Sequence, residues 1–369
     1  MWIFHARVGE NVLQTYFGEW VMKSVGRRWI LLSAAYLFAA ASVGVQAQTV
    51  KITPLGSQAG EYCATDRAML FEDPTGVRIL YDAGASVAGA GDPRLGDVHV
   101  VLLSHAHGDH IGVNKAAGLN AGTCARPETV SALPATTTGE IIAAKNSAIM
   151  TGLEMTSLLA KKVEAIRGSA IDNCAETGLT RDTMVPLQAP CRAGVQLGGK
   201  RTFKAAGQAK GVQVTTVFAV HSNNVARPML SEAGRTPLAP DDLVGYVGHA
   251  NGFVLVFTNG LRVYLSGDTG IMSEMKTIIG DFHKPNLVII NLGATTMPSE
   301  EAAYAVNTLI RPATVIPSHS SEAATEGGKL KPGSRTQDFV RLVKGRKVHL
   351  SLSDRTMEFD GRAKCVSGC

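Results

Sequence analysis

The chain has 369 residues, of which 45% are apolar and 18% are charged, and its formal net charge at pH 7 is +5. This length and apolar content suffice for one large domain with a buried core. The basic residues are spread along the chain rather than clustered, which argues against a nucleic-acid groove and against a membrane-binding patch.

Residues 1–47 have the features of an N-terminal extension that ends in an export signal. Basic residues precede an apolar run from Trp29 to Val45, and a small-residue cleavage site ends at Ala47. Met22 is the more natural start of such a signal. An uncleaved membrane anchor is the alternative, but the run falls short of the ~20 residues that a bilayer span needs. We expect cleavage after Ala47 and a periplasmic or secreted domain over 48–369, without stable membrane association.

The six cysteines fit an exported protein, because an even number in an oxidising compartment suggests disulfides. Proximity in the chain favours the pairs Cys365–Cys369 and Cys174–Cys191, which leaves Cys63–Cys124. A thiolate zinc site is the alternative, and the absence of any Cys-x-x-Cys spacing argues against it. We therefore interpret the cysteines as structural.

Residues that can bind metals follow five short apolar strands. The expected strands are 78–81, 98–103, 212–220, 261–265 and 314–316, and they are followed in order by Asp82, the run 105–110, His221, Asp268 and His319. Alone, His221 or Asp268 would be interpreted as an ordinary strand-end or turn residue. Their repeated position after strands favours one site at a shared sheet edge.

The second strand end carries the motif His105-Ala106-His107-Gly108-Asp109-His110. In an extended loop, His105 and His107 stand two residues apart, project to the same side and can bind one ion together. Asp109 and His110 are adjacent, so they diverge and can reach a second ion. Imidazole and carboxylate are the ligands of open catalytic zinc sites. A His-rich surface loop is the alternative that this density of ligands argues against.

The motif resembles the His-x-His-x-Asp-His signature of the metallo-β-lactamase superfamily, and the resemblance covers roughly residues 50–360. It implies an α/β fold, the four-layer αββα sandwich, with a dinuclear metal site along one edge of its two sheets. By the roles in that family, His105, His107 and His221 hold the first metal. The second is held by Asp109, His110 and His319, with Asp268 bridging the two ions. Asp82 steadies the ligand loop through hydrogen bonds.

The C-terminal part is similar to the ascorbate-phosphate lactonase-like branch of that superfamily. The stretch from Gly267-Asp268-Thr269 to Pro317-Ser318-His319 carries this similarity, and it includes an expected helix over 300–310. The N-terminal part departs from the branch. An insertion is expected at about 114–210, with one helix over about 138–166. We expect both regions to line the pocket, so the substrate of that branch does not carry over to this chain.

The resemblance implies a hydrolase with a small-molecule substrate. Two divalent ions, zinc by default and manganese or iron as alternatives, share a hydroxide that attacks a polarised carbonyl or phosphoryl group. Asp109 orients that hydroxide. A lactone, ester or amide is the first expectation. The alternative substrates are a β-lactam and a phosphodiester. In a different functional class, the alternative is a metal-binding protein without turnover. The sequence does not indicate an oligomeric state.

Overall fold

The computed structural model describes residues 48–178, 181–225 and 245–369. The expected extension and signal peptide lie outside these ranges. In the described part of the chain, no helix has both the length and the apolar character that crossing a bilayer requires.

Two mixed sheets form the centre of the fold. In spatial order, the first contains β11 (Cys191–Arg192), β9 (Ala148–Met150), β4 (Val100–Leu102), β3 (Arg78–Tyr81), β2 (Met69–Glu72), β1 (Val50–Pro54), β23 (Met357–Phe359) and β24 (Cys365–Ser367). The second contains β10 (Asp182–Val185), β12 (Lys200–Ala205), β13 (Val212–Phe218), β16 (Asn251–Val256), β17 (Arg262–Leu265), β18 (Leu287–Asn291), β19 (Thr314–Ser318) and β22 (Lys347–Val348).

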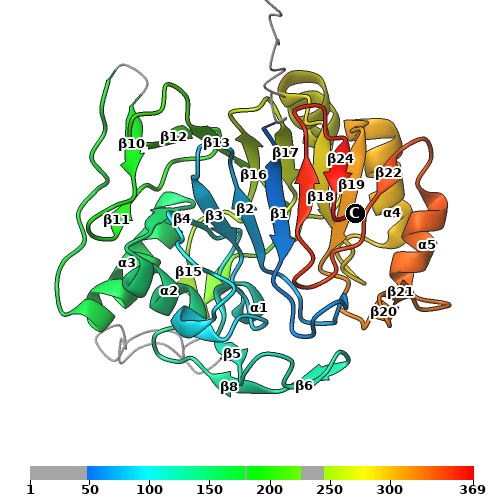
Figure 1. The fold of residues 1–369 in the computed structure, drawn as a ribbon, viewed down its shortest axis with the longest axis horizontal. Coiled ribbons are helices and arrows are strands. Elements are labelled where there is room, and N and C mark those ends of the chain that lie inside the picture. Colours follow the sequence, from blue (N-terminus) through cyan, green and yellow to red (C-terminus); the bar gives the residue numbers. More distant parts are fainter. Residues whose placement is uncertain (1–47, 179–180, 226–244) are drawn as a thin grey trace, which may run out of the picture. The chain divides into compact units, whose positions relative to one another are not determined.

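Helices cover the outer face of each sheet. In Figure 1, α2 (Thr137–Lys145) and α3 (Leu153–Arg167) lie on one side of the strands, and α4 (Ser299–Tyr304) and α5 (Arg335–Leu342) lie on the other. Among the described residues, the remaining helical segments are the short α1 (Gly108–Ile111), the 3-10 turn Gly89–Gly91, and the π-helical segments Met275–His283 and Ala305–Ile310. Small two-stranded sheets decorate the loops: β5–β8 (Asn114–Ala116, Thr129–Ser131), β6–β7 (Gly122–Thr123, Arg126–Pro127), β14–β15 (Asn224–Val225, Gly245–Tyr246) and β20–β21 (Thr325–Glu326, Lys329–Leu330).

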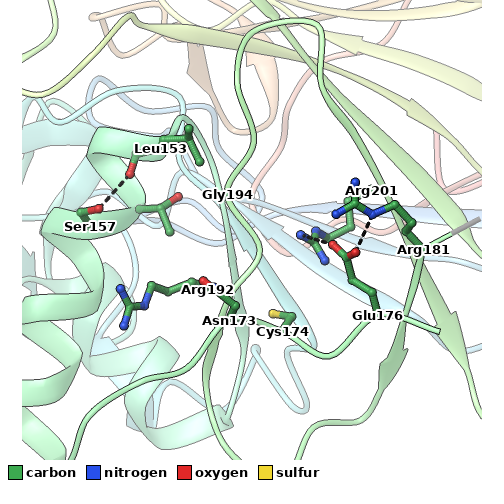
Figure 2. A pocket seen from close by; sticks show the side chains of 10 residues that line it. Leu153, Ser157, Asn173, Cys174, Glu176, Arg181, Arg192, Gly194 and Arg201 are labelled. Atoms are coloured by element: carbon green, nitrogen blue, oxygen red, sulfur yellow. Dashed lines mark hydrogen bonds and ion pairs between the residues drawn. The ribbon is translucent and has the colours of Figure 1, made fainter.

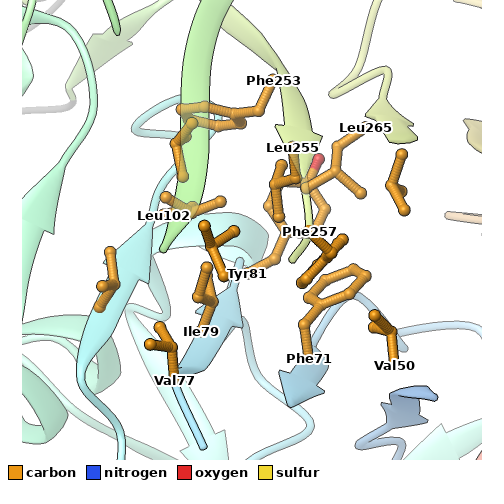
Figure 3. Packing of buried hydrophobic residues seen from close by; sticks show 14 of the residues in the cluster. Val50, Phe71, Val77, Ile79, Tyr81, Leu102, Phe253, Leu255, Phe257 and Leu265 are labelled. Carbon is orange, nitrogen blue, oxygen red and sulfur yellow. The ribbon is translucent and has the colours of Figure 1, made fainter. Parts of the chain in front are cut away.

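The strands are apolar on both faces because each sheet is buried on both sides. Alternate residues of one strand therefore enter different cores. In β3, Ile79 and Tyr81 face the core between the sheets, whereas Leu80 faces α2 and α3. Figure 3 shows part of the core between the sheets, where Phe71 of β2 stacks on Phe257, the residue after β16, at 6.0 Å between ring centroids.

The second sheet alternates in the same way. Leu287 and Ile289 of β18 enter the central core, and Val288 and Ile290 pack under the helices that precede and follow that strand. Three apolar cores thus separate four layers. The predicted αββα sandwich is confirmed.

One predicted helix is wrong. The segment expected to be a single helix over about 138–166 contains α2, then β9, then α3. Asn146 ends α2 in the left-handed conformation (φ 54°), which asparagine tolerates better than most residues. The apolar run after it is short enough to be a buried strand, and it pairs in parallel with β4. The segment 114–210 therefore supplies strands to both sheets.

All six cysteines are paired, and the three predicted disulfides are confirmed: Cys63–Cys124, Cys174–Cys191 and Cys365–Cys369. The first joins segments 61 residues apart. It ties the loop before β2 to the loop between β6 and β7.

The central core allows a test of the packing. Phe71 is fully buried, and Phe71→Ala should lower the free energy of unfolding by about 3–5 kcal/mol, because it removes a ring and leaves a cavity. The matched control is Phe282→Ala, since Phe282 is 68% exposed and its loss should cost less than about 0.5 kcal/mol. Urea unfolding measures both. Equal losses would contradict the central position of Phe71.

Candidate metal centre

The five strand ends named from the sequence meet at one edge of the sandwich. In the first sheet β3 and β4 are parallel, so Asp82 and residues 104–110, the ligand loop after β4, lie at the same end of that sheet. In the second sheet β13 and β17 both run antiparallel to β16, and β17, β18 and β19 are parallel to one another. His221, Asp268 and His319 therefore follow strands that point the same way.

The structure brings all seven predicted ligands together in two groups. Their ligand atoms lie within 4.8 Å of one another in each group: His105, His107 and His221 in the first, and Asp109, His110 and His319 in the second. Asp268 joins them, because it also groups with His105 and His110. Its Oδ2 lies 3.3 Å from His110 Nε2 and 2.8 Å from His319 Nε2. That these residues bind metal stays a prediction.

Asp82 lies behind the second group and is 1% exposed. Its carboxylate accepts hydrogen bonds from the Ser104 amide at 2.8 Å and from the Ser104 hydroxyl at 2.6 Å. His110 Nδ1 lies 2.8 Å from the same carboxylate. An Nδ1 proton shared with Asp82 leaves Nε2 of His110 free to face the centre. The structure therefore places Asp82 where the resemblance implied, as a support for the ligand loop.

Among the buried side-chain atoms that have no hydrogen-bond partner in the described part of the chain, three belong to residues of one possible metal-binding group: His105 Nε2, His110 Nε2 and Asp268 Oδ1. Buried polar atoms are normally paired, and leaving them unpaired destabilises the fold. A divalent cation would satisfy all three. The donor set therefore fits a metal ion.

Burial and neighbouring charges together shift the pKa values of the buried groups at the centre. Burial lowers the pKa of His105 well below its usual value, aided by the nearby positive charge of His110. For His110 burial acts in the same direction, but the carboxylates of Asp268 and Asp82 outweigh it and raise its pKa to about 10. Burial would raise the pKa of Asp268, but the imidazoles of His110 and His319 hold it well below its usual range. The centre therefore stabilises the buried carboxylate of Asp268 in its charged form, next to the protonated ring of His110.

Three further residues contribute to the centre and were not predicted from the sequence. Asn223 Oδ1 accepts a hydrogen bond from the Ala106 amide at 2.8 Å and fixes the ligand loop. His107 Nε2 lies 3.3 Å from Asn224 Oδ1. Arg67 Nε and Nη2 both lie 3.2 Å from Asp109 Oδ2. The two asparagines follow His221 after one intervening residue, Ser222, which is a usable signal. Nothing near Arg67 in the sequence indicates the metal motif.

A pocket of about 550 Å³ lies elsewhere in the fold, and none of the seven predicted ligands lines it. Figure 2 shows Glu176 between Arg181 and Arg201 on its wall, with Arg192 and the start of α3 on the opposite side. The carboxylate of Glu176 forms ion pairs with Arg181 Nε at 2.5 Å and with Arg201 Nη2 at 2.9 Å. Because its carboxylate is shared within the protein, we interpret this cluster as structural.

Comparisons with known proteins agree with this geometry. Residues 64–319, more than half of the chain, match the family model described as the beta-lactamase superfamily domain. A metal-dependent hydrolase of Cupriavidus taiwanensis is 27% identical over 237 residues, which cover 64% of this chain and 63% of that protein. One from Cupriavidus necator is 37% identical over 110 residues, or 30% of this chain and 35% of that protein. The matches thus span less than two thirds of the length of either relative.

A solved structure shares the fold. Igni18, a metallo hydrolase from the archaeon Ignicoccus hospitalis, aligns over 85% of this chain and 99% of its own, with a TM-score of 0.50 and 21% identity. That similarity concerns the architecture alone. Together with the family match and the sequence relationship to proteins named metal-dependent hydrolases, it identifies the chain as a member of the β-lactamase superfamily with the metallo-β-lactamase fold.

Proposed function

We propose that this chain is an exported dinuclear metal-dependent hydrolase whose substrate is a neutral lactone, ester or amide with an apolar group. The observation that carries the proposal is the set of seven donors in two groups joined by Asp268. Two groups of three with one shared carboxylate match the needs of two adjacent ions. The names of the sequence relatives support the hydrolase class. The expected signal and the three disulfides support export.

The donors are imidazoles and carboxylates, which suit zinc and also manganese or iron. When bound, two such ions would act as Lewis acids toward water and toward the oxygen of the substrate. The side chain of Asp109 is 45% exposed, against 3% for His110 and 7% for Asp268. Hydrogen bonding from His319 and the charges of His110 and Arg67 hold its pKa well below the usual range, although burial opposes this. Asp109 is thus an ionised acceptor that can orient water.

Apolar side chains next to the ligands support the choice of substrate. Val220 precedes His221 and is 46% exposed, and Ile271 is 37% exposed. The loops that carry them are joined by a hydrogen bond from the Gly270 amide to the Val220 carbonyl at 3.1 Å. Among the described residues, Arg67 is the cation that contacts Asp109, and it is only 7% exposed, too buried to meet a substrate anion. These features favour a neutral apolar substrate over a phosphodiester.

Turnover tests the proposal. The mature protein, loaded with zinc or manganese, is assayed against lactones, esters, amides, β-lactams and phosphodiesters of matched size. We expect hydrolysis of an apolar lactone, ester or amide. In Asp109→Ala, kcat/KM for that substrate should fall by about two orders of magnitude or more, because the orienting carboxylate is lost. Preferred cleavage of a β-lactam or a phosphodiester would refute the substrate class. Two bound metals with no turnover would favour a non-catalytic role.

Metal content tests the ligand assignment. His107→Ala should abolish binding of the first metal and His319→Ala should weaken the second, as measured by elemental analysis after dialysis against zinc. The control is His99→Ala, because His99 accepts a hydrogen bond from the Arg78 amide just before β4 and belongs to neither group. It should keep both metals. Full metal content in His107→Ala and His319→Ala would contradict the assignment.

Metal binding should also depend on pH. Because the pKa of His110 is raised to about 10, chelator-stripped protein holds an extra proton at pH 7 that an incoming ion must displace. Affinity should therefore rise with pH, by roughly tenfold per unit between pH 7 and 9 for that one proton. Calorimetry in buffers of different protonation enthalpy would count the protons released. Binding with no proton release and no pH dependence would contradict the arrangement around His110.

A further inference from the structure

Arg67 is a buried cation that contacts the most exposed of the carboxylates at the centre. Its side chain is 6% exposed, and its Nε and Nη2 both lie 3.2 Å from Asp109 Oδ2. The same oxygen lies 3.4 Å from His319 Nε2 and 3.6 Å from His110 Nε2. The guanidinium of Arg67 thus holds Asp109 Oδ2 close to the Nε2 atoms of His110 and His319, the other two members of the second group.

The third guanidinium nitrogen is bound to the loop that carries Arg67. Nη1 donates to the carbonyl of Ala64 at 3.2 Å and to that of Asp66 at 3.0 Å. The amide of Ala64 donates in turn to the carbonyl of Cys124 at 3.3 Å, beside the Cys63–Cys124 disulfide. A continuous series of contacts therefore runs from this disulfide through Arg67 to Asp109.

Local packing keeps Arg67 against the ligand loop. Gly84 has a φ of 57°, and its amide donates to the His110 carbonyl at 3.0 Å. A Cβ at Gly84 would lie 2.7 Å from the Asp109 carbonyl oxygen and 3.2 Å from Arg67 Cβ. A glycine is required here for both segments to approach so closely.

We propose that Arg67 is the positioning residue for Asp109 and that the Cys63–Cys124 disulfide anchors it. Asp109 lies in the first turn of the four-residue helix α1, and nearly half of its side chain is exposed. Without the guanidinium its carboxylate would rotate into solvent, so the second group would lose a fixed donor. The inference rests on the proposed function only in taking Asp109 as a metal ligand, and it does not depend on the substrate.

Charge and geometry make opposite contributions at this position. The positive charge of Arg67 repels an incoming cation, so charge alone predicts tighter metal binding when it is removed. Arg67→Lys separates the two effects, because lysine keeps the charge. The guanidinium uses two nitrogens to contact Asp109 and its third nitrogen to contact the carbonyls of Ala64 and Asp66. Lysine has a single nitrogen and cannot make all of these contacts.

The experiment measures each metal site separately by zinc calorimetry. Arg67→Lys in the His107→Ala background reports on the second site, and in the His319→Ala background on the first. We expect second-site affinity to fall about 10- to 100-fold, as for other residues that orient metal ligands, and first-site affinity to change less than about twofold. The matched control is Arg78→Lys, because Arg78 pairs with Glu72 at the opposite end of β3 from Asp82. It should alter neither site.

An unchanged second site, or equal losses at both sites, would overturn the proposal. If Arg67→Lys does not fold, as judged by circular dichroism, the anchor is tested instead. Cys63→Ala/Cys124→Ala should weaken the second site selectively, whereas Cys174→Ala/Cys191→Ala should leave it unchanged. Equal effects of the two disulfide pairs would overturn the anchoring role. A protein that binds two metals but hydrolyses nothing refutes the proposed function and leaves this inference intact.

Discussion

The buried carboxylate of Asp82 at the end of β3 accepts both the amide and the hydroxyl of Ser104, the first residue of the ligand loop. It also fixes the ring of His110 through Nδ1. One carboxylate therefore sets the position of the loop and the free nitrogen of a ligand. The remaining predicted ligands can converge because the strands of both sheets end at this edge. Loss of Asp82 would leave the loop without its main polar contact, whatever the quality of the apolar cores.

The interior can accept this polar cluster because its apolar layers are extensive. Alternation along β3 and β18 fills three separate cores, so the sheets stay rigid while their ends carry polar residues. The polar cluster itself is electrostatically unfavourable. It gathers buried imidazoles and carboxylates whose facing atoms lack partners among the described residues. A bound cation would supply the partner that these atoms lack, and metal binding would then be linked to the stability of this edge.

The fold and the centre differ in how far the sequence predicts them. The motif at 105–110, and Asp268 and His319, could be found because each follows an apolar strand. Two of the disulfides followed from the proximity of their cysteines in the chain, and the third was the pair that remained. The break at Asn146 was missed because the apolar spacing of α2 and α3 continues through β9, so periodicity alone does not separate them. Arg67 was missed for another reason. Its contact with Asp109 joins residues 42 apart, and only the packed structure brings them together.

The exposure of the ligands bears on catalysis as opposed to simple metal storage. His110 and Asp268 are buried, and Asp82 closes the centre behind them, so neither water nor substrate can approach from that side. Asp109 is the exposed member of the second group, and Arg67 contacts it from within the protein. A site that only retained metal would gain from burying this carboxylate as well. Arg67 fixes the carboxylate from its buried side, and the other side stays accessible to solvent. A reacting molecule requires this arrangement, because the approaching group then meets a fixed acceptor.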